Sequence, residues 1–339
     1  MRWLFVFVLG GCATLADAGG GDENAPNANA GPFRELRPGE LGNGHTAPYA
    51  LRDAASFVRD VSVLDDDGDP TTFGVTAFAA RRVSADTVSP DPSSITNELV
   101  SFKASDARSF ELTPHFLLRA DSEGEGGWLG APSAVRSSDG IWLYYAAADG
   151  IRLAHSPTGE AFTRDSVNPV LAVAKTGWEK GSVPASPSVL RLPDGSWRMF
   201  YEVNGALGEA RSSDGRNWLR GPAPVLQAAS GAGPLAAPCA VISRSPLGRD
   251  RLWLYHSAVA SDGHRAIEVA TSDGFDGAYA RALSPVFGRG ADLEPTEPSV
   301  VRFAEFSLIF VTEQAGKSKA LAYPAVAVGV APATFGALP

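Results

Sequence analysis

One unit of sequence returns along most of this chain, and it limits the possible folds more than any other feature. The unit reads as a strand of Pro-Ser-Val type, a turn, an aromatic strand, and a small-residue strand that ends in Ser-x-Asp-Gly. The clearest copy runs from Ser186 to Trp218, and a degenerate first copy begins at Asp60. The four clearer copies open with prolines that stand 55, 51 and 60 residues apart: Pro132, Pro187, Pro238 and Pro298. The chain therefore holds five units.

The spacing of these units predicts the architecture. A repeat of about 40 to 50 residues with about four short strands is typical of β-propeller blades. Apolar and polar residues alternate over short runs, and Gly, Pro or Asp stands at nearly every break, as expected of strands rather than helices. One unit alone cannot bury both of its faces, so the units must stack around an axis. We predict an all-β fold, a five-bladed β-propeller, over residues 44–339.

Composition narrows the class of partner. The 339 residues include 36 Gly and 25 Pro, and 44% are hydrophobic, which is typical of a turn-rich globular domain. Because the repeat covers most of the chain, a single domain is expected. The net charge of −9 argues against a nucleic-acid partner, because a protein that binds nucleic acid needs a basic face. The sequence has no run of about 18 apolar residues, so no membrane-spanning helix is predicted.

The amino terminus carries a separate signal. Arg2 precedes the apolar run Trp3–Leu9, and the sequence continues as Gly10-Gly11-Cys12. This segment resembles a bacterial lipoprotein signal, and the resemblance implies cleavage before Cys12 and lipidation of that cysteine. Residues 1–11 are then the signal peptide, and residues 12–43 are a flexible tether, since they hold few large apolar side chains. The alternative is that Trp3–Leu9 forms a first strand.

The same signal predicts the location. A lipid-anchored protein of the bacterial cell envelope is expected, with the outer membrane favoured and the lipid as its only contact with the membrane. With Cys12 lipidated, Cys239 has no disulfide partner. Cys239 stands where sister units have Ser133, Ser188 and Ser299, so the pattern predicts a buried small residue rather than a nucleophile.

A string of residues in the third unit carries a likeness to known enzymes: Gly177-Trp178-Glu179, Val183, Pro187-Ser188-Val189, Trp197–Tyr201, Gly208-Glu209-Ala210, Ser213-Asp214-Gly215 and Trp218. It resembles a blade of the five-bladed furanosidase-type glycoside hydrolases, which include arabinanases, xylosidases, levanases and mannoside phosphorylases. In that family the first strand of each blade lines a central funnel with three carboxylates. A base or nucleophile stands on the first blade, a helper Asp on the second and an acid Glu on the third.

Only one of these three carboxylates has a match here. Asp60 stands at the first-blade position, where the resemblance implies a base. The corresponding stretches of the second and third blades contain neither Asp nor Glu: Gly130-Ala131-Pro132-Ser133 and Ala185-Ser186-Pro187-Ser188. This departure weighs against standard hydrolysis.

Other acidic residues could replace the missing ones. Glu297 stands at the same strand position on the fifth blade, and Glu202 and Glu313 end second strands. Glycoside cleavage usually needs a protonated acid that faces an ionised carboxylate, and Asp60 with Glu297 or Glu202 could form such a pair. The alternative is that these carboxylates bind backbone amides and hold the starts of strands.

Aromatic residues suggest a ligand-binding role. Trp128 and Trp178 each precede an inner strand, and the resemblance implies that such positions lie near the rim of the funnel. Indole rings can stack on sugar faces, so both are candidate ligand contacts. His256, beside Tyr255 on a second strand, is a third candidate. By contrast, Trp142, Trp197 and Trp253 recur on second strands and are expected in the core of the blades.

The sequence predicts no metal site and no cofactor. No two histidines share metal-ligand spacing, and the acidic run Asp65–Asp69 does not fit the EF-hand register because Val63 stands at a ligand position. An ordinary acidic turn is expected there. The family resemblance leaves a calcium ion on the propeller axis as an alternative, since some relatives have one.

Three functions remain. The first is a surface-anchored propeller that binds carbohydrate without standard catalysis, which the missing carboxylates and the tryptophans favour. The second is a divergent glycoside hydrolase that uses Asp60 with Glu297 or Glu202. The third is a scaffold that binds another protein of the envelope.

Overall fold

The computed structural model describes residues 33–36, 40, 49–51, 56–83, 96–111, 113–244, 250–261, 263–282, 284–287, 293–304, 306–315 and 325–332. The elements named within these residues, β1 to β22, are all strands. No helix in this described part is long and apolar enough to cross a membrane. Cys12 and the predicted signal peptide lie outside the described residues.

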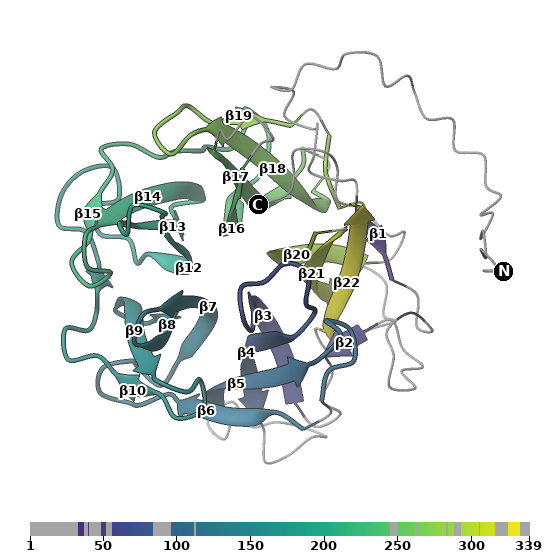
Figure 1. Ribbon diagram of the computed structural model, residues 1–339. Coiled ribbons are helices and arrows are strands. Elements are labelled where there is room, and N and C mark those ends of the chain that lie inside the picture. Colours follow the sequence, from purple (N-terminus) through teal and green to yellow (C-terminus); the bar gives the residue numbers. More distant parts are fainter. Residues whose placement is uncertain are drawn as a thin grey trace, which may run out of the picture.

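The strands form five antiparallel sheets around a common centre (Figure 1). The first sheet contains β3 (Ser56–Asp65), β4 (Val75–Val83), β5 (Thr96–Ala104) and β6 (His115–Arg119). The second contains β7 (Leu129–Ser137), β8 (Gly140–Ala147), β9 (Gly150–Ser156), β10 (Thr163–Arg164) and β11 (Leu171–Ala172). The third contains β12 (Ala185–Arg191), β13 (Trp197–Val203), β14 (Ala206–Ser212) and β15 (Leu219–Arg220).

The fourth sheet contains β16 (Leu235–Arg244), β17 (Asp250–Val259), β18 (Arg265–Asp273) and β19 (Ala280–Arg281). The fifth contains β20 (Leu293–Arg302), β21 (Phe306–Ala315) and β22 (Ala325–Pro332), together with β1 (Arg34–Glu35) and β2 (Tyr49–Leu51). The inner strands β3, β7, β12, β16 and β20 contact one another in this order, and β20 contacts β3. The prediction of an all-β propeller is confirmed.

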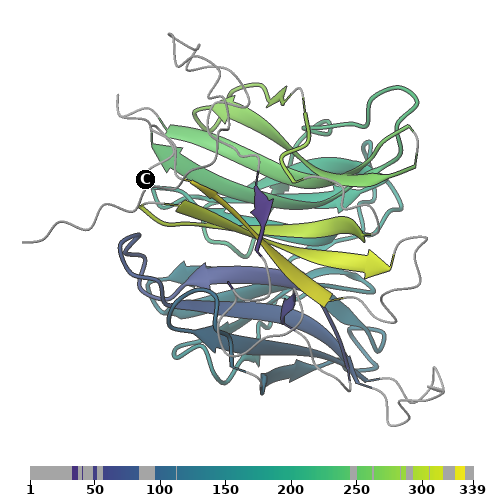
Figure 2. The same ribbon diagram turned by 90° about the vertical axis from the view of Figure 1, so that its right-hand side faces the viewer.

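The first and the last described strands pair in the fifth sheet. Arg34 and Glu35 of β1 pair with Val330 and Gly329 of β22, and Figure 2 faces this seam, where the purple strand crosses the yellow one. The ring thus includes residues within the segment 12–43 that was expected to be a tether. The physical reason is local: Phe33 and Leu36 flank β1 and are both buried, so this short stretch has apolar surface to bury.

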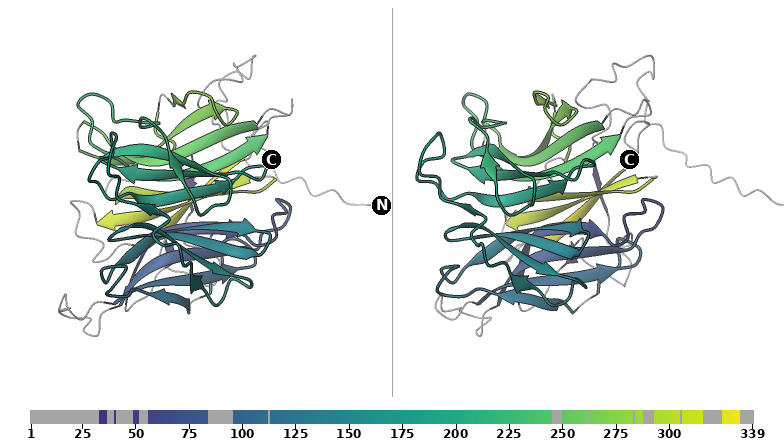
Figure 3. Two further views of the ribbon diagram at one scale, coloured as in Figure 1. Left: turned by 90° about the vertical axis from the view of Figure 1, so that its left-hand side faces the viewer. Right: turned by 60° about the vertical axis from the view of Figure 1, so that its left-hand side comes forward.

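Hydrophobic clusters fill the five spaces between neighbouring sheets. Trp142 and Trp197, from the second and third sheets, stack with ring centroids 5.0 Å apart, and Trp253 is fully buried between the fourth and fifth. The core role predicted for these tryptophans is confirmed. Side views from the opposite edge show the sheets packed face to face, with inner edges toward the axis (Figure 3).

Each inner strand bends at the same place. Its register against the second strand shifts across one β-bulge, for example between Arg59 and Ser62 in β3. The first bulged residue has a φ between 45° and 55° in all five strands, although none is glycine: Asp60, Ala131, Ser186, Ala237 and Glu297. A non-glycine residue rarely adopts this conformation, and bulges of this kind redirect a side chain. The five bulges therefore turn these five side chains away from the sheets and toward the axis.

A closed ring of hydrogen bonds links the inner strands just beyond the bulges. Each sheet donates one backbone N–H to a hydroxyl or thiol of the preceding sheet, at distances from 2.8 to 3.3 Å. The donors and acceptors are Ala134 to Ser62, Val189 to Ser133, Ala240 to Ser188, Val300 to Cys239, and Val63 to Ser299. Cys239 thus takes the place of a serine, as the repeat predicts.

Removal of one acceptor from this ring is expected to destabilise the whole propeller. Ser133→Ala leaves the buried N–H of Val189 without its acceptor, and the free energy of unfolding should fall by about 2 kcal/mol. Cys239→Ser supplies an oxygen acceptor in place of sulfur and should change it by less than about 1 kcal/mol. Urea unfolding measures both. Ser122→Ala, at an exposed position, is the control, and equal stability of S133A and S122A would contradict the role of the ring.

Candidate functional site

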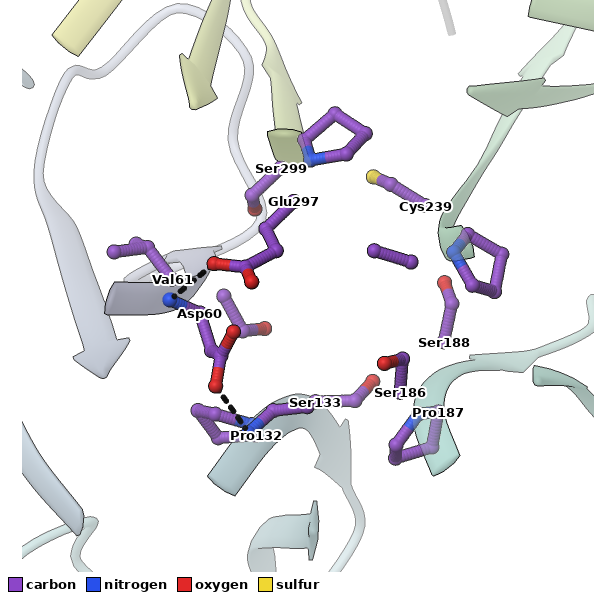
Figure 4. Close-up of a pocket in the computed structure, with 15 residues that line it drawn as sticks. Asp60, Val61, Pro132, Ser133, Ser186, Pro187, Ser188, Cys239, Glu297 and Ser299 are labelled. Carbon is purple, nitrogen blue, oxygen red and sulfur yellow. Dashed lines mark hydrogen bonds between the residues drawn. The ribbon is translucent and has the colours of Figure 1, made fainter. Parts of the chain in front are cut away.

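The bulges of all five inner strands surround one pocket on the propeller axis (Figure 4). The space between the five strands amounts to about 410 Å³, a figure that includes the part open to solvent. Its lining consists of three equivalent residues from each strand: 60–62, 131–133, 186–188, 237–239 and 297–299. Two of the sequence-predicted residues, Asp60 and Glu297, are among them.

The bulge positions differ in chemistry around the ring. Neighbouring strands β3 and β20 bring Asp60 and Glu297 together, as Figure 4 shows. The other three positions hold the short side chains of Ala131, Ser186 and Ala237. One side of the pocket therefore carries acidic side chains, and the opposite side carries small, uncharged ones.

Arg59 ties the two carboxylates to each other. Its guanidinium donates from Nε to Asp60 Oδ1 at 3.1 Å and from Nη2 to Glu297 Oε1. The backbone N–H of Asp60 donates to Glu297 Oε2 at 3.1 Å, and the N–H of Ala131 donates to Asp60 Oδ2 at 3.1 Å. All four carboxylate oxygens therefore have a partner within the protein. Sequence reasoning missed Arg59, because the two carboxylates that it joins are far apart in the sequence.

The two carboxylates are buried, and this affects their protonation. Asp60 is 8% exposed, and the pKa of Glu297 is raised to about 8, chiefly by burial. The nearby charge of Asp60 contributes to this rise, while the charge of Arg59 opposes it. Glu297 is thus a carboxyl group that can carry a proton near neutral pH.

Glu202 approaches the pocket from the third sheet. Its Oε2 accepts hydrogen bonds from Ser186 Oγ at 3.2 Å and from the N–H of Ala237 at 3.3 Å. Burial raises its pKa, and the charge of Asp60 adds to the effect. The structure therefore brings the three predicted carboxylates around one pocket, with Glu202 behind Ser186 rather than in the lining.

The position of Glu202 has equivalents in two other sheets. Ser257 Oγ accepts the N–H of Glu297 at 2.9 Å, and Thr312 Oγ1 accepts the N–H of Asp60 at 3.2 Å. In each case a polar side chain on a second strand accepts a hydrogen bond from the backbone N–H of the bulged residue in the next sheet. Glu202 thus has a structural task as well as its place near the pocket.

Trp128 lies near Asp60, just outside the residues that line the pocket. It is 41% exposed, one of the most exposed large apolar side chains among the described residues. Gly130 stands between them: a Cβ there would lie 3.1 Å from Trp128 Cζ2 and 3.2 Å from Asp60 Oδ2. The glycine therefore allows the indole ring and the carboxylate to flank the same point, with the ring open to solvent.

The other two predicted ligand contacts lie elsewhere. Trp178 packs against the core between the second and third sheets, and its Nε1 is buried without a hydrogen-bond partner. His256 is fully buried, with Nδ1 3.2 Å from the carbonyl oxygen of Leu254 and Nε2 3.6 Å from Glu268. None of the three predicted ligand contacts is in the lining of the axial pocket, but Trp128 is the one that lies close to a lining residue, Asp60, across Gly130.

The described residues contain no group of three or more His, Cys, Asp or Glu side chains arranged to hold a metal ion. In the acidic turn, Asp65 and Asp67 accept hydrogen bonds from backbone N–H groups of the turn itself. This is the ordinary function of Asp in a turn. Burial raises the pKa of the Cys239 thiol to about 11, which is unfavourable for a nucleophile.

Comparison with solved structures identifies the fold. The α-L-arabinofuranosidase of Podospora anserina, solved with cellotriose, is 14% identical, with a TM-score of 0.60 over 92% of this chain and 99% of that chain. The catalytic domain of the Coprinopsis cinerea GH62 α-L-arabinofuranosidase is also 14% identical, with a TM-score of 0.62 over 93% of this chain and 100% of that chain. An exo-1,5-α-L-arabinanase from a bovine ruminal metagenomic library is 14% identical, with a TM-score of 0.55 over 83% and 94%.

At this level of identity the likeness establishes the fold alone. The chain has the propeller fold of these glycoside hydrolases along nearly its whole length. No protein-family model matches the sequence, and no curated protein sequence matches it. The chemistry must therefore be argued from the pocket itself.

The buried carboxyl of Glu313 generates a pH prediction. Glu313 is 3% exposed, and Oε2 has no hydrogen-bond partner. Burial, with a contribution from Glu35, raises its pKa to about 7 from an ordinary 4.5. Between these values the folded state keeps a proton that the unfolded state has lost, so the free energy of unfolding falls as the pH rises, by up to about 1.4 kcal/mol per unit.

Glu313→Gln should remove this contribution. The variant should gain stability over the wild type as the pH rises from 5 to 8, and denaturant unfolding at several pH values measures the difference. The exposed Glu160 provides the control variant Glu160→Gln, which should follow the wild type. A difference between E313Q and wild type that is independent of pH would contradict the assignment.

Proposed function

We propose that this chain is a five-bladed propeller, one blade per sheet, whose axial pocket binds carbohydrate without standard glycoside hydrolysis. The observation that carries the proposal is the proximity of an exposed indole, Trp128, to the largely buried carboxylates of an axial pocket. Such a combination suits a sugar, because the ring offers an apolar face and the carboxylates accept hydrogen bonds from hydroxyl groups. Structural neighbours described as complexes with cellotriose and xylotriose support a saccharide ligand.

The state of the carboxylates supports binding over hydrolysis. Cleavage usually needs one carboxyl that donates a proton and one carboxylate that is free to act as base or nucleophile. Here a single guanidinium bridges Asp60 and Glu297, and backbone N–H groups occupy their other oxygens. The positions of the second and third family carboxylates hold Ala131 and Ser186.

One observation favours the second candidate, a divergent glycoside hydrolase. The raised pKa of Glu297, about 8, suits a general acid, and Asp60 or Glu202 would then be the base. This reaction would require a substrate to displace Arg59 from at least one carboxylate. The third candidate, a protein-binding scaffold, needs neither carboxylates nor an exposed indole at the axis.

A saccharide-binding assay distinguishes the three. Calorimetry with arabino-, xylo- and cello-oligosaccharides should detect binding, and Trp128→Ala should weaken it about tenfold, a loss of about 1.4 kcal/mol of binding free energy. Trp178→Ala, which alters a half-buried ring outside the pocket, is the matched control and should retain affinity.

The same sugars tested for cleavage complete the experiment. No reducing sugar should be released by the wild type. Release that disappears in Asp60→Asn or Glu297→Gln would establish the hydrolase instead, and neither binding nor release with any saccharide would favour the scaffold.

We further propose that Cys12 anchors the propeller to the bacterial envelope through lipid. The Leu9-Gly10-Gly11-Cys12 sequence supports this proposal. The residues between Cys12 and Phe33 would then separate the lipid from β1, the first described strand.

Lipidation has a direct test. Cells fed a labelled fatty acid should incorporate it into the wild type but not into Cys12→Ala, and the variant should leave the membrane fraction. Cys239→Ala is the control and should keep the label. Equal labelling of C12A and wild type would contradict the anchor.

A further inference from the structure

We propose that Glu125 is a positioning residue, which holds the loop 121–128 so that Trp128 stands beside the axial pocket. The inference rests on the proposed function, because it concerns the residue taken to contact the sugar. Trp128 has few means of fixing its own place, since its ring is substantially exposed. Its orientation must come from the loop that carries it.

The side chain of Glu125 is completely buried, and both of its carboxylate oxygens accept hydrogen bonds. Oε1 accepts hydrogen bonds from Tyr145 Oη at 2.6 Å and from Arg164 Nε at 2.7 Å. Oε2 accepts one from Arg164 Nη2 at 2.9 Å and one from the N–H of Asp121 at 2.9 Å. The carboxylate thus joins the second strand of the second sheet, its outer strand and the start of the loop.

The backbone of the same residue reaches Trp128 directly. The carbonyl oxygen of Glu125 accepts the N–H of Trp128 at 3.2 Å. Gly126 and Gly127 both have positive φ, 62° and 72°, a conformation that glycine adopts without strain. They turn the chain tightly between Glu125 and Trp128. A displacement of Glu125 would therefore carry the indole with it.

The burial of Glu125 destabilises the fold unless the carboxylate is fully hydrogen-bonded. A buried carboxylate loses its hydration, and only full pairing compensates for the loss. Glu125 is fully paired, by a guanidinium, a phenol and a backbone N–H. A network of this kind allows one geometry, which is what a loop that presents an exposed ring requires.

The third sheet repeats the same cluster without the exposed ring. Glu179 is 2% exposed; its Oε1 accepts from Tyr201 Oη at 2.5 Å, and its Oε2 accepts from Arg220. The tryptophan on that loop, Trp178, packs into the core instead. Two blades thus share one structural device, and only one of them presents an indole to the pocket.

This duplication supplies matched variants. Glu125→Gln should weaken binding of the saccharide identified by the panel about fivefold to tenfold, up to about 1.4 kcal/mol, whereas Glu179→Gln should not change the affinity. Both variants disrupt the same kind of buried cluster, so they should lose similar stability. Tyr145→Phe and Tyr201→Phe remove only a hydroxyl and repeat the comparison if either glutamine variant fails to fold.

Amide hydrogen exchange measures how firmly the loop is held, and this measurement needs no ligand. Amides of 121–130 should exchange faster in E125Q and Y145F than in the wild type, while E179Q and Y201F should leave this segment unchanged. Equal affinities of E125Q and E179Q, with W128A still impaired, would overturn the positioning role and leave the proposed function standing. An unimpaired W128A, or a wild type that binds no saccharide, would overturn both.

Discussion

The hydrogen-bond ring on the propeller axis is the constraint on which the rest of this structure depends. Each sheet gives one buried N–H to the sheet before it, and the last link returns from Val63 to Ser299. In this ring no sheet supplies the acceptor for its own N–H donor. All five donors are therefore paired only when all five sheets are in place. The apolar clusters between sheets provide the bulk of the burial, but they are not directional. The ring fixes the register of the inner strands relative to one another.

The same constraint creates the pocket. The bulge that brings each serine or cysteine into the ring also gives the preceding residues a left-handed conformation and turns a side chain to the axis. Five axial positions follow from the architecture, whatever residues fill them. In this chain three are filled with small side chains, and the two acidic ones share Arg59. Both axial carboxylates are thus held by hydrogen bonds from within the protein.

The repeat made much of the architecture predictable, because strand order, turn residues and aromatic core positions recur in every unit. Asp60 and Glu297 were predictable for the same reason: both occupy the axial position of the repeat. The bridge by Arg59 could not be read from its sequence position, since the two carboxylates it joins are 237 residues apart.

Trp128 and Trp178 looked equivalent in sequence, but their side chains have different surroundings in three dimensions. The pairing of β1 with β22 was missed because two residues carry too little pattern to be recognised.

The difference between these two tryptophans shows how a repeated fold can place equivalent residues in different surroundings. Both loops are held by a buried glutamate that a tyrosine and an arginine satisfy. In the third sheet the glutamate follows the tryptophan, and the ring enters the core. In the second sheet the glutamate precedes it by three residues with two glycines between, and the ring is delivered to the axis beside Gly130. A stable element common to both sheets therefore exposes an indole ring in one of them, through the order of a few residues.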